Sequence, residues 1–145
     1  AQVLPFVRKL KARFDFDVIA AQWAWPDGPV AMHLSRRLGV PFSMKARGPD
    51  FINPARNRSI LAQMVEAGHR AGGLLAVSAG LRETMVRLGM PDRIAVHYTG
   101  LDHGAFRPGD RERAKAELGL SGPVLLIAGN IAPRKGQITA LRALR

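Results

Sequence analysis

Arg134 and Lys135 are the residues of this chain whose type and spacing best suit chemistry on an anion. They follow an apolar run, 124–128, that predicts a strand buried on both faces, and they precede a stretch that predicts a helix. A helix begins with free backbone N–H groups and the positive end of its dipole, so cations beside it would suit a phosphate. We therefore expect an anion-binding turn that starts with Gly129 and Asn130.

The glycines around this turn exclude two common phosphate-binding motifs. A Walker loop needs a glycine directly before its lysine, and Arg134 holds that place. The dinucleotide fingerprint needs further glycines at fixed spacing from Gly129, which the sequence lacks. The alternative is a basic turn that is only solvated, and the turn by itself leaves that alternative open.

Polar residues also follow the other predicted strands, which span 18–21, 42–46, 74–77 and 94–97 and alternate with predicted helices. This alternation predicts an α/β fold with a Rossmann-like parallel sheet, wound in the doubly wound manner. Ligands of such sheets bind at the carboxyl ends of the strands. We expect a substrate cleft there, lined by Trp23 to Gly28, Arg47, Gly48, Asp50, Ser78, Gly100 and Asp102.

Ser78 has a second interpretation. Residues 76–80 read Ala-Val-Ser-Ala-Gly, which is close to the nucleophile elbow of serine hydrolases. Ala76 replaces the first glycine of that motif, and a serine before a predicted helix is also a preferred N-cap. We favour the cap and keep the hydrolase as the weaker alternative.

No metal site is expected. Asp15 and Asp17 form a D-x-D pair, but they stand before a predicted strand, whereas ligand crevices open at the other end of a strand. His33 has no partner at metal-ligand spacing, so we assign it to a helix surface. The absence of cysteine excludes disulfides and thiolate ligands.

The charge balance predicts an anionic partner, since 22 lysines and arginines against 11 acidic residues give a net charge of +11. The cations are spread along the chain and aromatic residues make up only 6%, so we expect no nucleic acid partner. A basic amphipathic helix predicted at 3–14 is most simply a surface helix, although such a helix can also lie on an anionic membrane. No signal-peptide core is recognisable, so we expect a cytoplasmic location. Peripheral contact with the inner membrane face is compatible with this location.

Taken in order, the strand-end motifs resemble the family 4 glycosyltransferases, which have the two-domain GT-B fold. The motifs that carry the resemblance are Trp25-Pro26-Asp27-Gly28, Leu38-Gly39-Val40-Pro41, Arg47-Gly48-Pro49-Asp50, Val77-Ser78-Ala79-Gly80-Leu81-Arg82, Thr99-Gly100-Leu101-Asp102 with Phe106 and Pro108, and Ala128-Gly129-Asn130 with Pro133-Arg134-Lys135-Gly136. The resemblance implies transfer of a sugar from a nucleotide diphosphate sugar to a cell-envelope or polysaccharide acceptor. The acceptor would be a glycan, a lipid-linked compound or a small molecule. The configuration would be retained, with no metal and no cofactor beyond the sugar donor.

The resemblance also implies roles for single residues. Gly129, Asn130, Arg134 and Lys135 would bind the donor diphosphate. Asn130 stands where many members carry a further arginine. Arg47 stands where the family motif often has histidine, so we expect it to contact substrate and assign it no catalytic role. The resemblance assigns no catalytic residue within this chain, because the family's donor-binding carboxylates would follow residue 145.

The same comparison suggests how the chain is divided. We expect residues 1–105 to be the C-terminal part of an N-terminal, acceptor-side domain, 106–122 an interdomain linker with a short helix, and 123–145 the start of a C-terminal, donor-binding domain. The chain would then be an internal fragment of a longer protein, inactive alone. The main alternative is a nucleotide-binding or polyanion-binding α/β module without chemistry.

Overall fold

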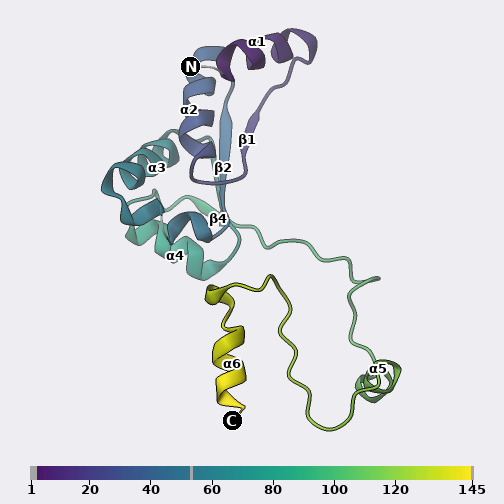
Figure 1. Cartoon of the computed structure of the whole chain (residues 1–145). Coiled ribbons are helices and arrows are strands. Elements are labelled where there is room, and N and C mark those ends of the chain that lie inside the picture. The colour runs from purple at the N-terminus through teal and green to yellow at the C-terminus, as the bar shows by residue number, and fades with distance from the viewer. Residues whose placement is uncertain (1–2, 53, 145) are drawn as a thin grey trace. The chain divides into compact units, whose positions relative to one another are not determined.

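The computed structural model describes residues 3–52 and 54–144, and the chain divides into two units, Ala1–Gly100 and Leu101–Arg145 (Figure 1). The first unit holds a sheet of four parallel strands in the order β1-β2-β3-β4. The strands are β1 (Ile19–Ala21), β2 (Phe42–Ala46), β3 (Gly73–Ala76) and β4 (Ile94–Val96). The predicted parallel α/β sheet is confirmed, and each strand lies within one residue of its predicted bounds.

Helices connect successive strands, namely α2 (Asp27–Leu38), α3 (Arg58–Arg70) and α4 (Ala79–Arg87). Parallel crossovers are right-handed, so a sheet that grows in one direction places its connecting helices on one face. Figure 1 shows α2, α3 and α4 together on one side of the strands. The expectation of a doubly wound sheet is therefore not met in the described residues, because winding on both faces requires the strand order to reverse.

Burial along the strands shows which face the helices cover. Phe42, Met44 and Ala46 of β2 are buried, whereas Ser43 and Lys45 between them are only half-buried. The core on the covered face is rich in methionine, a flexible side chain that fills irregular gaps between helices and sheet. The fully buried side chains of largest volume are Met44, Met64 and Met85.

Two glycines let the helices approach this core closely. A Cβ atom on Gly28 in α2 would lie 2.5 Å from Sδ of Met44, and one on Gly68 in α3 would overlap Sδ of Met90. An alanine at either position would therefore force the methionine side chain beside it to shift.

A side-chain cap sets the start of α3. Residues Pro54–Arg56 form a short 3₁₀ turn and α3 begins at Arg58. Asn57 precedes the helix, and its Oδ1 accepts hydrogen bonds from the backbone N–H of Ser59 at 3.0 Å and Ile60 at 3.2 Å. This N-cap satisfies donors that the first turn leaves unpaired.

The predicted basic helix forms as α1 (Val3–Arg13) and has no buried residue. Phe6 and Leu10 of α1 and Phe14, which follows the helix, are exposed. Lys11 donates a hydrogen bond of 2.6 Å to Oδ1 of Asp15, and this bond together with the lysine's charge lowers the pKa of Asp15. No helix in the described parts of the chain is long and apolar enough to cross a membrane.

The second unit contains α5 (Arg111–Glu117) and α6 (Gln137–Ala143), joined by a long irregular segment. The strand predicted at 124–128 does not form, and Leu125 and Leu126 are 61% and 84% exposed. The apolar sequence does favour a strand, but a strand exists only through hydrogen bonds to a neighbour. The described residues of this unit include no other strand to supply that neighbour. The domain boundaries stay a prediction.

Candidate functional site

In the first unit, the candidate site lies at the carboxyl edge of the sheet, where residues 22–25 follow β1, 47–50 follow β2 and Ser78 follows β3. Since parallel strands end at the same edge, these loops become neighbours. The first two loops, 22–25 and 47–50, are joined by hydrogen bonds that involve the side chains of Asp50 and Arg47, and these bonds define the geometry of the edge.

Asp50 is buried, with 2% of its surface exposed. Its Oδ2 accepts a hydrogen bond from the backbone N–H of Ala24 at 2.8 Å. Its Oδ1 accepts from the N–H groups of Gly48 at 2.9 Å and Arg47 at 3.3 Å. Gly48 has a φ of +105°, which a residue with a Cβ rarely adopts and which turns its N–H toward the carboxylate. The carboxylate predicted to line the cleft thus points inward and ties two loops together.

Arg47 is exposed and is held by the β1 loop. Its Nε donates to the carbonyl oxygen of Gln22 at 3.1 Å, and its Nη2 donates to Oε1 of the same residue at 2.9 Å. The guanidinium carbon lies 5.9 Å from the ring centre of Trp23, within reach of a cation–π interaction. Within the described residues the other three N–H donors of the guanidinium make no hydrogen bond, so they can bind an anion.

Two further basic side chains, Lys45 and His97, extend this edge and were missed by sequence reasoning. Nζ of Lys45 lies 2.9 Å from Nδ1 of His97, which follows β4. Lys45 is two residues before Arg47, and both are at positions opposite the helix-covered face. A lysine inside the predicted strand 42–46 was the available signal, but its partner follows another strand.

Ser78 caps α4, as expected. Its hydroxyl oxygen accepts a hydrogen bond of 3.2 Å from the backbone N–H of Leu81. This use of the oxygen explains why serine stands at the strand-to-helix turn and removes the main reason for a hydrolase. The residues that the structure describes contain no cluster of acidic or histidine side chains that could hold a metal ion.

In the second unit, the basic turn brings the predicted anion-binding residues together. Arg134 and Lys135 end the 3₁₀ turn Pro133–Lys135 and are exposed. The side chain of Lys135 folds over Gly129, where a Cβ atom added to the glycine would lie 3.6 Å from Cε and 3.7 Å from Nζ of the lysine. The carbonyl oxygen of Asn130 accepts a hydrogen bond of 3.0 Å from Nε2 of Gln137. The turn therefore presents two cations beside exposed backbone.

Gly100 and Asp102 lie at the division between the units. Asp102 makes a local turn in which its Oδ1 accepts from the N–H groups of Gly104 at 2.8 Å and Ala105 at 3.4 Å. This turn gives the aspartate a structural use. A contact of either residue with substrate stays a prediction.

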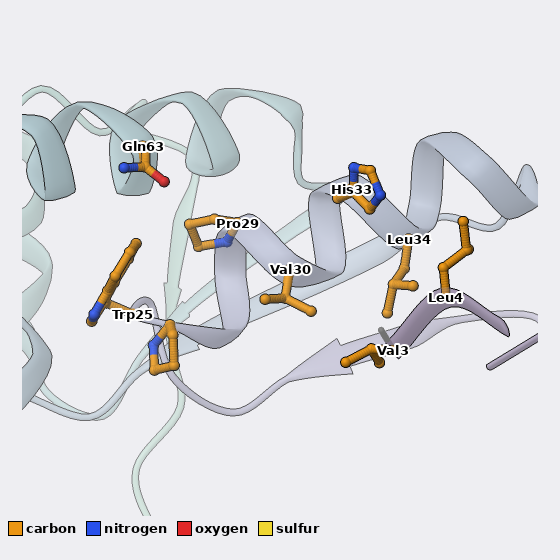
Figure 2. Close-up of a pocket in the computed structure, with 9 residues that line it drawn as sticks. Val3, Leu4, Trp25, Pro29, Val30, His33, Leu34 and Gln63 are labelled. Atoms are coloured by element: carbon orange, nitrogen blue, oxygen red, sulfur yellow. The ribbon is translucent and has the colours of Figure 1, made fainter. Parts of the chain in front are cut away.

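The first unit also has a cavity of about 300 Å³ between α1, α2 and α3 (Figure 2). Its lining is mainly apolar, with His33 and Gln63 as polar members. Trp25 and Pro26, which were predicted for the substrate cleft, line this cavity. Arg47, the cation predicted for the cleft, does not line it. His33 is exposed on α2, as expected for a helix surface.

The chain is similar to known glycosyltransferases. The profile of Glycosyltransferase Family 4 matches residues 1–104. The D-inositol 3-phosphate glycosyltransferase of Frankia alni is 34% identical over 142 residues, which cover 88% of this chain and 34% of the relative. D-inositol 3-phosphate glycosyltransferase 1 of Catenulispora acidiphila is 33% identical over 147 residues, 92% of this chain and 35% of the relative. The chain thus spans about a third of these relatives.

Among solved structures, Anabaena HepE in complex with UDP matches 99% of this chain and 40% of its own, with a TM-score of 0.71 and 21% identity. The same protein in complex with UDP and glucose matches with a TM-score of 0.70 and 20% identity. At this level of identity the likeness shows a shared fold.

Proposed function

Because the chain belongs to glycosyltransferase family 4, we propose that it is part of an enzyme that transfers a sugar from a nucleotide diphosphate sugar to an acceptor hydroxyl. The proposed reaction retains the anomeric configuration and uses no metal. The observation that carries the proposal is the basic turn, where Lys135 folds over Gly129 next to Arg134.

In this proposal Gly129, Asn130, Arg134 and Lys135 bind the donor diphosphate. When the bond to the sugar breaks, negative charge grows on the leaving nucleotide diphosphate, and fixed cations stabilise that charge as a metal ion would in other enzymes. Gly129 supports this role because, with no side chain, it lets an anion approach the backbone closely. Both similar structures are complexes with UDP, which supports a nucleotide donor.

The proposed acceptor is a hydroxyl compound that carries a phosphate. Two observations support it, namely the basic carboxyl edge with Lys45, Arg47 and His97, and the name of the relatives, D-inositol 3-phosphate glycosyltransferase. Such an acceptor is either a small molecule or a lipid-linked intermediate of cell-envelope or polysaccharide synthesis. For the second case we propose peripheral contact of α1 with an anionic membrane on its cytoplasmic side.

The test of the donor site uses Lys135→Ala in the full-length protein, with Lys9→Ala as a control that removes the same charge from exposed α1. A hydrogen bond to a charged group contributes about 1.5–3 kcal/mol. We therefore expect Lys135→Ala to weaken UDP binding about 10- to 100-fold in calorimetry and to leave uridine binding nearly unchanged. Lys9→Ala should leave both affinities unchanged.

Two results would contradict this function. Equal loss of UDP and uridine affinity would mean that Lys135 does not contact the diphosphate. Binding of many polyanions with a steep dependence on salt, without transfer of sugar to D-inositol 3-phosphate or to lipid-linked phosphates, would favour a binding module without chemistry.

A further inference from the structure

The carboxylate of Asp50 is placed to bind the protein's own backbone and not a substrate. It is buried, and its two oxygens accept hydrogen bonds from three backbone N–H groups, those of Ala24, Arg47 and Gly48. Backbone N–H groups stabilise a buried carboxylate because hydrogen bonds to an ionised acceptor are short and strong. With three of about four acceptor positions used inside the protein and only 2% of its surface exposed, Asp50 is poorly placed to bind a sugar hydroxyl.

The three donors come from two loops of the carboxyl edge. Ala24 lies between Trp23 and Trp25 in the loop after β1, and Arg47 and Gly48 follow β2 directly. One oxygen of Asp50 serves each loop. The guanidinium of Arg47 makes the second connection between the loops, through Gln22. The buried carboxylate therefore holds the backbone beneath the exposed cation.

We infer that Asp50 is a positioning residue, which fixes the loop of Trp23 and the backbone of Arg47 so that the guanidinium is held in place for the anionic group of the acceptor. The loop geometry stands on the contacts of this chain alone, whereas the effect on the acceptor rests on the proposed function. Asp50 acts through Arg47 and touches neither substrate.

The chain offers a direct probe of this loop, because its two tryptophans, Trp23 and Trp25, flank the Ala24 N–H that Asp50 binds. The full-length protein would be labelled with fluorotryptophan, and the fluorine NMR signals of both residues assigned through Trp23→Phe and Trp25→Phe. Asp50→Asn keeps one oxygen for Arg47 and Gly48 but turns an amide donor toward Ala24. Asp50→Ala removes all three acceptor contacts.

We expect Asp50→Asn to shift both tryptophan signals, and Asp50→Ala to shift and broaden them further. In acceptor kinetics, Asp50→Ala should lower kcat/KM for a phosphate-bearing acceptor about 10- to 100-fold, since small misplacements of a binding group cost that much. The loss should appear mainly in KM for the acceptor, with donor KM unchanged.

Two controls separate positioning from general loss of stability. Asp92→Asn makes the same chemical change in a surface ion pair with Arg82 and should leave the tryptophan signals in place. Ile94→Val trims a buried side chain of β4 and should lower the melting temperature without an effect on acceptor KM.

Unchanged tryptophan signals in both Asp50 variants would overturn the inference, whatever the activity. So would a loss of acceptor kcat/KM in Ile94→Val equal to that in Asp50→Ala. If the wild-type protein transfers no sugar but the Asp50 variants shift the tryptophan signals, the positioning of the loops stands and the proposed function fails.

Discussion

At the scale of single residues, Asp50 and Arg47 belong to one motif but have different roles. Both were predicted to line the cleft from their place after β2. The side chain of Asp50 turns inward to backbone N–H groups. The side chain of Arg47 remains exposed and contacts Gln22 and Trp23. A motif read from sequence names both residues equally. The direction in which each side chain points depends on the backbone conformation of the turn, which includes the positive φ of Gly48.

Arg47→Lys is predicted to weaken binding of a phosphate-bearing acceptor although the charge is kept. Arginine spends two donors on Gln22 and offers the rest to the ligand, whereas lysine has one ammonium that cannot make both sets of bonds at once. We expect acceptor KM to rise about 10-fold, equivalent to about 1.4 kcal/mol. Arg37→Lys, at an exposed position of α2, is the matched control, and equal effects of the two changes would contradict the prediction.

At the scale of elements, close approach between helices and sheet determines where a larger residue than glycine would disturb the packing. Gly28 and Gly80 both occupy the second residue of a helix, α2 and α4 respectively. A Cβ atom on Gly28 would meet Met44 at 2.5 Å and Ala67 at 3.6 Å, whereas one on Gly80 would have no atom within 4 Å. The two glycines are therefore equivalent in local structure and different in packing.

Gly28→Ala is predicted to lower the free energy of unfolding by about 1–3 kcal/mol, because the added methyl group overpacks the core at Met44. Gly80→Ala should be neutral or raise it by up to about 1 kcal/mol, since alanine restricts the unfolded chain and favours helix. Urea unfolding of both variants of the full-length protein measures the difference. A Gly28→Ala protein as stable as Gly80→Ala would show that Met44 moves aside without cost.

At the scale of the whole molecule, charge and an uncovered apolar surface coincide in α1. The chain carries +11, and α1 presents Phe6 and Leu10 to solvent, each beside basic residues of the same helix. This combination is typical of helices that lie in a membrane interface. The proposed lipid-linked class of acceptor would require such contact.

The full-length protein is predicted to bind liposomes with anionic lipids at low salt and to lose much of this binding at moderate salt, because the attraction between charges is screened. Phe6→Ser should weaken the binding further. Phe106→Ser, which changes an equally exposed phenylalanine of the second unit, should not. Co-sedimentation without binding at either salt concentration, or equal loss in both variants, would remove the membrane contact from the proposal.

The sequence by itself determined the parallel α/β class, the bounds of β2, the cap at Ser78 and the family, because these depend on local periodicity, on backbone preferences and on motifs in order. The inward turn of Asp50, the pairing of Lys45 with His97 and the close packing of Gly28 against Met44 depend on atoms far away in the sequence. The predicted strand at 124–128 was wrong for the same reason. Its side chains favour a strand, but hydrogen bonds to a neighbouring strand form it, and only the tertiary structure decides whether that neighbour is present.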